Sequence, residues 1–139
     1  MAETGKLELS VYYEDTDSGD IVYYANYLKF MERSRAELLK EIGYSQATLK
    51  MGYRVGLVVF DVNIKYHKPA RFEDNLTVFS SVDDITNTSI VWNQKIFRFD
   101  ECMPITEAVC KTACVSKGFK PTRLPSDLSE KLSLYQTNK

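Results

Sequence analysis

The sequence contains a single histidine, His67, and this scarcity excludes several common kinds of active site. A serine hydrolase of the usual type needs a histidine beside its nucleophile and a G-x-S-x-G elbow, which this chain lacks. The sequence also has no glycine-rich phosphate loop and no histidine and cysteine spacing typical of zinc. His67 falls on the more polar face of an expected strand, which favours a surface or interface position.

Cysteine is scarce as well, and Cys102, Cys110 and Cys114 are the only three. An odd count without a disulfide framework is typical of reduced thiols and therefore of a cytoplasmic protein. Cys110 and Cys114 fall on one face of an expected strand. Two small core residues are the favoured interpretation, and a metal-binding pair is the alternative. We expect no bound metal ion.

Long apolar runs and an excess of one charge are also missing. No segment approaches the ~20 apolar residues of a transmembrane helix, and residues 1–6 lack the apolar run of a signal peptide. Lysine and arginine number 18 against 19 aspartate and glutamate residues, so a basic surface for nucleic acid or an anionic membrane is not expected. We expect no nucleic-acid partner and no stable membrane insertion.

The sequence does have a clear order of periodic segments. Residues 7–13 alternate apolar and polar side chains, as strands do. Residues 25–42 hold the only long helical pattern, and Gly43 is a natural stop after it. The stripe along that helix comprises Leu28, Met31, Arg35, Leu38, Leu39 and Ile42. Four strand-like runs follow, at residues 58–67, 76–82, 90–99 and 106–116.

This order predicts a single α+β domain over residues 1–139. A lone amphipathic helix must bury its stripe on a sheet, so a curved antiparallel sheet of about five strands should wrap around the one long helix. Arg35 falls within the stripe and is expected to pair with Glu32, or with an acid across an interface. The uncovered sheet face and the edge strands favour assembly with further copies.

The most informative segment is the acidic turn at residues 15–20, which lies between the first strand and the helix. It places a carboxylate beside the unpaired N–H groups of a helix start, and such N–H groups suit an oxyanion. From the residues alone, Asp17 is either a turn or helix cap or a catalytic carboxylate. The turn does not match the calcium-binding loop of an EF-hand, because Asp20 and Asn26 stand where that loop needs glycine and glutamate.

Residues 11–28 resemble the signature of hotdog-fold acyl-CoA thioesterases, Y-x-D-T-D-x-x-G-x-V-Y-x-A-x-Y-L. Within the 4-hydroxybenzoyl-CoA thioesterase family, the group associated with the Tol–Pal envelope system is the best match. The resemblance continues at residues 28–35, 66–74 and 120–125, and so covers nearly the whole chain in order. It implies the hotdog fold, which agrees with the order of the periodic segments.

The resemblance implies catalytic roles for three residues. Asp17 would be the nucleophile or general base, and the backbone N–H groups around Tyr23 and Tyr24 would hold the oxyanion. Tyr24 stands where relatives usually carry histidine, and its hydroxyl cannot shuttle protons near neutral pH as histidine does. Asp20 stands where glycine is common. Tyr13 is either a pocket wall and hydrogen-bond donor or a core aromatic of the strand.

Five residues are candidates for substrate binding. Tyr23 and Asn26 flank the expected helix start. Lys117, Lys120 and Arg123 cluster after the last strand, either as ordinary surface charges or as contacts to the phosphates of coenzyme A. Coenzyme A would be part of the substrate, so no cofactor is expected.

The predicted function is hydrolysis of acyl-CoA or related acyl thioesters, with acyl carrier protein as a possible donor. The family resemblance implies sites between paired protomers, in a homodimer or a homotetramer. A hotdog hydratase is disfavoured, because it needs a paired aspartate and histidine. The alternative from another class is a non-catalytic protein that binds acyl thioesters or acts as a scaffold in envelope lipid metabolism, which the unusual Tyr24 favours.

Overall fold

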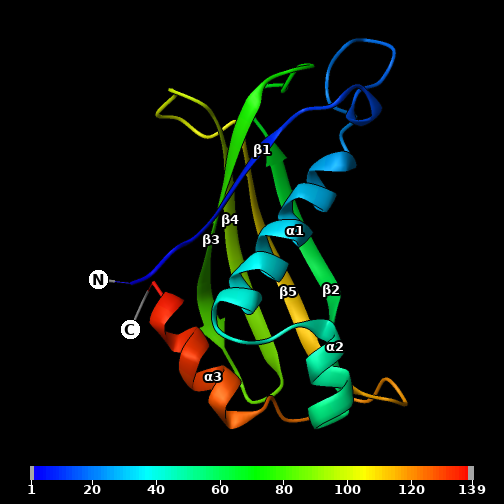
Figure 1. The fold of residues 1–139 in the computed structure, drawn as a ribbon, viewed down its shortest axis with the longest axis vertical. Coiled ribbons are helices and arrows are strands. Elements are labelled where there is room, and N and C mark those ends of the chain that lie inside the picture. Colours follow the sequence, from blue (N-terminus) through cyan, green and yellow to red (C-terminus); the bar gives the residue numbers. More distant parts are fainter. Residues whose placement is uncertain (1, 138–139) are drawn as a thin grey trace.

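The computed structural model describes residues 2–137, where five strands form one antiparallel sheet. These strands are β1 (Gly5–Ser10), β2 (Val55–Tyr66), β3 (Asn75–Ile85), β4 (Ser89–Arg98) and β5 (Thr106–Ser116). Their order in space is β1-β3-β4-β5-β2. Helix α1 (Asn26–Glu41) lies across one face of the twisted sheet (Figure 1). The predicted curved antiparallel sheet of about five strands is confirmed, and it is accompanied by α1 and shorter helices.

Shorter helical segments fill the connections. A turn η1 (Tyr13–Asp15) follows β1. The short helix α2 (Gln46–Thr48) and a π-helical turn η2 (Leu49–Tyr53) precede β2. The last two elements are α3 (Ser126–Leu132) and η3 (Ser133–Tyr135). Ser45 caps α2, since its hydroxyl accepts a hydrogen bond from the Thr48 N–H at 3.1 Å. None of the helices within residues 2–137 is long and apolar enough to cross a membrane.

The buried face of α1 differs in part from the predicted stripe. Met31, Leu38 and Leu39 are buried as predicted, but the expected Leu28 is exposed, and Tyr27 and Phe30 are buried instead. The physical reason lies at the helix start, where the Asn26 side chain is buried against the preceding loop and sets the rotation of the helix. The apolar stripe therefore begins one residue earlier than predicted.

Arg35 also has a different partner from the predicted one. Its Nη1 donates to Gln94 Oε1 on β4 at 2.8 Å, and within residues 2–137 no ion pair joins it to Glu32. The pairing expected within the helix is therefore wrong. The side chain points from α1 to the sheet, where an amide oxygen satisfies one of its five donors.

Gln94 is the centre of a buried polar network between the helix and the sheet. The Gln94 side chain is fully buried, and its amide nitrogen donates to the Met31 carbonyl at 2.9 Å and to Ser80 Oγ at 2.8 Å. Ser80 in turn lies 2.7 Å from the Ser34 hydroxyl. Because an unpaired polar group would be costly here, this network fixes α1 on β3 and β4 in one position.

Cys110 and Cys114 lie on the same face of β5 and are buried in the apolar core, as their spacing predicts. Burial raises the pKa of both thiols. For Cys110 the nearby Arg35 charge acts in the opposite direction, although burial is the larger effect. Both are therefore core residues that stay protonated near neutral pH.

Strand β2 forms one edge of the sheet, and its exposed side chains include the apolar Val59, Phe60 and Val62. Its register against β5 shifts between Val59 and Asp61, which leaves Phe60 as the extra residue of a β-bulge and interrupts the predicted alternation. Phe60 is 59% exposed, and Val59 is 46% exposed. Exposed apolar side chains on the edge strand of a sheet favour pairing with another strand.

We predict that Gln94→Leu lowers the free energy of unfolding by about 2 kcal/mol, because it leaves buried polar partners unpaired. Asn93→Leu, one position away on the opposite face of β4, is the matched control and should change stability by about 0.5 kcal/mol or less. Urea unfolding of both variants measures the difference. Equal effects of the two changes would contradict a special role for the buried network.

Candidate functional site

The acidic turn forms a small hairpin between β1 and α1. Thr16 pairs with Val22, and the Asp17 N–H donates to the Ile21 carbonyl at 2.9 Å. Asp20 has a φ of 63°, in the left-handed region that glycine adopts most easily and aspartate tolerates. This backbone explains why glycine is common at the position of Asp20 in the resembling family. The tip of the hairpin is exposed to solvent.

The two aspartates before the tip have different environments. Asp15 is only 8% exposed, and its carboxylate accepts hydrogen bonds from the Tyr12 N–H at 2.9 Å and from Asn26 Nδ2 at 2.7 Å. Asp17 is exposed, and its Oδ1 accepts one hydrogen bond from the Gly19 N–H at 2.8 Å. Asp17 Oδ2 makes no hydrogen bond to any residue from 2 to 137. Asp15 therefore holds the hairpin against the helix, while one carboxylate oxygen of Asp17 is left without a hydrogen-bond donor among residues 2–137.

The start of α1 offers two successive free donors. The Tyr23 N–H is occupied, because it donates to the Asp15 carbonyl at 3.0 Å, and the Asn26 N–H donates to the Tyr23 carbonyl at 2.8 Å. Tyr24 and Ala25 lie between these two residues in the chain. Neither of their N–H groups donates to an acceptor within the described residues 2–137. They lie at the positive end of a sixteen-residue helix, where an anion is stabilised.

Aromatic side chains surround this helix start and are largely exposed. Tyr24 is 63% exposed, with its ring 5.0 Å from that of Tyr23 and 6.3 Å from that of Tyr66. Tyr13 is 76% exposed, and its ring packs edge-on against Phe72 at 5.9 Å. The predicted strand at residues 7–13 ends at Ser10, so the alternative of Tyr13 as a core strand residue is wrong.

Asn26 is buried, and its side-chain amide is engaged by Asp15. Its candidate role in substrate binding stays a prediction, but its observed contact holds the hairpin against the helix. This contact is also the signal that sequence reasoning missed. Asp15 lies in η1 and Asn26 begins α1, so the two residues share no periodic segment and only the fold reveals their contact.

The segment after β5, which carries the three basic candidates, lies at the opposite end of the molecule from the loop between β1 and α1, which carries Asp17 (Figure 1). Val55 pairs with Ser116, just before Lys117 and Lys120, whereas Tyr66 at the other end of β2 reaches the start of α1. Twelve residues of β2 separate the two ends, roughly 36 Å at the usual strand rise. Within one chain the structure therefore does not bring Lys117, Lys120 or Arg123 beside Asp17.

A cavity of about 490 Å³ lies between α1, α2 and β2. Apolar side chains of α1, β2 and β4 make up much of its wall, and Arg35 is among its polar residues. The residues of this α1–β2 cavity are Glu32, Arg35, Ala36, Leu39, Lys40, Ser45, Gln46, Leu57, Val58, Val59, Trp92 and Thr112. Its size and mixed lining are those of a site for a small organic group.

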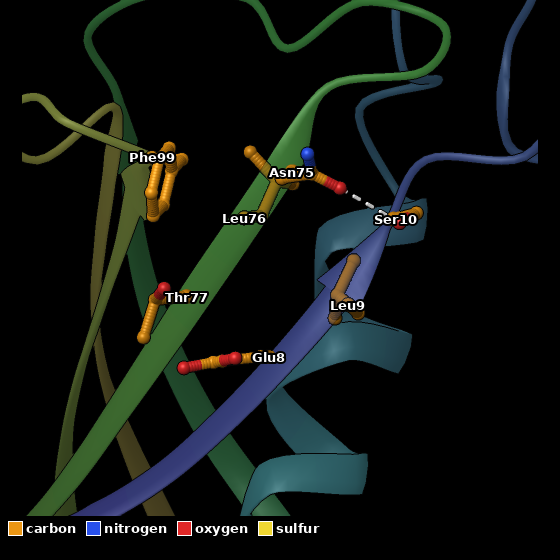
Figure 2. A pocket seen from close by; sticks show the side chains of 7 residues that line it. All are labelled: Glu8, Leu9, Ser10, Asn75, Leu76, Thr77 and Phe99. Atoms are coloured by element: carbon orange, nitrogen blue, oxygen red, sulfur yellow. Dashed lines mark hydrogen bonds between the residues drawn. The ribbon is translucent and has the colours of Figure 1, made fainter.

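A second hollow, of about 330 Å³, lies over β1 and β3 (Figure 2). There the Ser10 hydroxyl donates to Asn75 Oδ1 at 2.8 Å, and Phe99 lies on the far side of β3. Glu8 is its only ionisable side chain, and Glu8 pairs with Lys6 at 3.1 Å. The hollow holds none of the predicted catalytic residues.

His67 lies on the surface, where its Nε2 is 2.8 Å from Glu107 Oε2. No aspartate among the described residues contacts it, so the aspartate and histidine pair of a hydratase is not assembled within one chain. Across residues 2–137, no three His, Cys, Asp or Glu side chains come together as a metal site.

Comparisons with known proteins show the family and the fold of this chain. The profile of the thioesterase superfamily matches residues 19–102, a range that begins two positions after Asp17. The acyl-CoA thioester hydrolase YbgC of Escherichia coli O6:H1 is 38% identical over 119 residues, which cover 85% of this chain and 87% of that protein. The acyl-CoA thioesterase YbgC of Haemophilus influenzae is 36% identical over 85% of this chain and 86% of its own.

A solved structure also superimposes well. The probable thioesterase from Bartonella henselae has a TM-score of 0.84 and 28% identity, and the match covers 88% of this chain and all of that one. The curved sheet around α1 is therefore the hotdog fold that the sequence resemblance implies.

We predict that Asp15→Ala and Asp17→Ala differ strongly in stability. Asp15→Ala leaves the Tyr12 N–H and the buried Asn26 side-chain amide unpaired, so the free energy of unfolding should fall by about 2 to 3 kcal/mol. Asp17→Ala removes one exposed hydrogen bond and should cost about 0.5 kcal/mol or less. Thermal and urea unfolding measure both values. If Asp17→Ala were the more damaging change, the assignment of Asp15 as the structural carboxylate would be wrong.

Proposed function

Because the chain belongs to the thioesterase superfamily, we propose that it hydrolyses acyl-CoA thioesters. The observation that carries this proposal is the pairing of chemical groups at one hairpin and helix start. Asp17 has a carboxylate oxygen free to react, and the adjoining helix presents two unengaged N–H groups. A nucleophile or base together with oxyanion donors is what attack on a thioester carbonyl requires.

Asp17 acts in one of two ways. As a nucleophile its carboxylate attacks the thioester carbon, the C–S bond breaks, and coenzyme A leaves as a thiol after protonation. Water then hydrolyses the resulting mixed anhydride and restores the carboxylate. As a general base Asp17 instead removes a proton from the water that attacks the carbonyl directly. Both routes consume one water and release an acid and a thiol.

The N–H groups of Tyr24 and Ala25 stabilise the negative oxygen that forms in either route. Their position at the start of α1 adds the helix dipole to the two hydrogen bonds. The Tyr24 side chain is exposed and tunes the reaction rather than enabling it, because the donor is a backbone group. Tyr13 and Tyr23 flank the entrance and contact the substrate.

A homodimer formed through β2 completes the site. The free apolar edge of β2 supports an antiparallel pairing of two copies about a two-fold axis. In such a pair the Tyr66 end of one copy lies beside the Val55 end of the other. Asp17 and Tyr24 of one copy then approach the α1–β2 cavity and the basic residues of the second. Asp17 and the basic residues, which lie far apart in one chain, would thus form one site across the two copies.

This arrangement gives each part of the substrate a place. The α1–β2 cavity takes the acyl group, since its walls are largely apolar and its volume is about 490 Å³. Lys117, Lys120 and Arg123 then contact the phosphates of coenzyme A by charge-assisted hydrogen bonds. Coenzyme A leaves with the products and is not a retained cofactor.

The cell compartment and the wider partners stay predictions. We place the reaction in the cytoplasm, since Cys102, Cys110 and Cys114 are all free thiols. Acyl carrier protein as an alternative donor, association with the Tol–Pal system, and a tetramer built from two dimers remain proposals of the same kind.

We predict that Asp17→Asn lowers turnover of the best acyl-CoA substrate by at least ~100-fold, the scale of lost acid–base or nucleophilic catalysis. The amide keeps the size of the side chain, so the protein should fold and bind substrate as before. Thiol release from a panel of acyl-CoAs measures the loss. Saturable acyl-CoA binding by the unchanged protein without thiol release would favour the non-catalytic binding protein instead.

We also predict that the protein is at least a dimer and that Phe60→Asp separates the copies. Phe60 is exposed on β2, so a charge there should disturb the proposed interface without unfolding the chain. Phe99→Asp changes another exposed phenylalanine, beyond the end of β4, and serves as the control. Light scattering and thiol release report assembly and activity. A stable and fully active monomer would refute the shared site.

A further inference from the structure

Tyr66 is the last residue of β2, and its side chain makes a hydrogen bond to the backbone at the start of α1. Its hydroxyl donates a hydrogen bond to the Tyr24 carbonyl oxygen at 3.0 Å. Its ring packs against Tyr27 at 5.4 Å and edge-on against Tyr24 at 6.3 Å between ring centres. These contacts hold the ring from two sides, so the hydroxyl is aimed at one carbonyl.

The Tyr24 carbonyl and the Ala25 N–H belong to the same planar peptide group. No cis peptide bond occurs in residues 2–137, so this C=O and this N–H point in opposite directions. A hydrogen bond that fixes the oxygen therefore also fixes the direction of the N–H. It polarises the peptide as well, which makes the N–H a stronger donor.

We propose that Tyr66 is a positioning residue that orients and polarises the Ala25 N–H as an oxyanion donor. This inference rests on the proposed thioester hydrolysis and names the residue that prepares its oxyanion site. Tyr66 acts on the substrate only through the Tyr24–Ala25 peptide, with its hydroxyl on one side and the reacting oxygen on the other.

The neighbouring donor is set differently. The peptide that carries the Tyr24 N–H is fixed by a main-chain contact, in which the Asn26 N–H donates to the Tyr23 carbonyl at 2.8 Å. The orientation of the Tyr24 N–H thus survives any side-chain change. The orientation of the Ala25 N–H depends on the Tyr66 hydroxyl, so a single substitution separates the two donors.

The surroundings keep the Tyr66 hydroxyl protonated. Burial raises the pKa of Tyr66 above its ordinary value, and the nearby Tyr24 and Tyr27 act in the same direction. The hydroxyl therefore remains a donor throughout the neutral range, as a permanent contact to a carbonyl requires.

The test compares Tyr66→Phe with Tyr53→Phe. Both tyrosines are 43% exposed, and each donates one hydrogen bond through its hydroxyl, Tyr66 to a carbonyl at 3.0 Å and Tyr53 to Asp127 at 3.2 Å. The two substitutions remove the same atom and keep the same ring. Only the first breaks a contact at the start of α1.

Two readouts are measured on the full chain. The first is the amide nitrogen resonance of Ala25, which should shift in Tyr66→Phe and stay in place in Tyr53→Phe, because hydrogen bonding to a carbonyl changes the amide in the same peptide. The second is acyl-CoA turnover. Tyr66→Phe should lower kcat by about 3- to 10-fold with KM unchanged, the range expected for one neutral hydrogen bond. Tyr53→Phe should keep both constants.

Each readout tests the positioning role of Tyr66. An unchanged Ala25 resonance, an unchanged kcat in Tyr66→Phe, or an equal fall of kcat in Tyr53→Phe would overturn the inference. If the unchanged protein hydrolysed no thioester in the panel, the proposed function would fail instead. The Ala25 resonance would still report whether Tyr66 holds the peptide.

Discussion

The buried carboxylate of Asp15 is the constraint on which the candidate site depends. The two carboxylate oxygens accept hydrogen bonds from the Tyr12 N–H and the Asn26 side-chain amide. The main-chain carbonyl of Asp15 accepts a third from the Tyr23 N–H. One residue thereby ties together the end of the first strand, the second arm of the hairpin and the first residue of α1. Because Asp15 is only 8% exposed, losing either side-chain donor would leave one of its carboxylate oxygens buried without a hydrogen bond. Asp15 thus fixes the hairpin that carries the exposed Asp17.

A second set of contacts extends this framework to the sheet. Tyr27 is buried, and its hydroxyl accepts the Ala70 N–H at 3.0 Å, while the Ala70 carbonyl accepts the Val22 N–H at 2.9 Å. Farther along α1, Gln94 anchors the helix to β3 and β4. The helix start is therefore held from the hairpin, from the connection after β2 and from the sheet. Such support is what a preorganised oxyanion site needs, since a misdirected N–H stabilises little.

Strand β2 joins the chemistry to the proposed assembly. It ends at Tyr66, which reaches the start of α1, and its outer edge carries the exposed Val59 and Phe60. An edge with this composition is unfavourable in an isolated chain. Pairing through it would cover the apolar surface and also bring the distant basic residues to the hairpin of the other copy. The same proposed pairing would therefore bury exposed apolar side chains and bring together the residues of the site.

The sequence by itself determined the order of the strands and the helix, the family, and the position of the acidic turn between the first strand and the helix. Those features depend on alternation, helical spacing and contiguous motifs, all of which are local in the chain. It could not distinguish the structural Asp15 from the free Asp17, because burial depends on packing. It misplaced Leu28 and the partner of Arg35, since the rotation of α1 is set by Asn26 and Gln94. Only the tertiary structure decided that Lys117 lies far from Asp17 in one chain and that Tyr66 reaches Tyr24. These are relations between residues distant in sequence, and the folding of the sheet around the helix creates them.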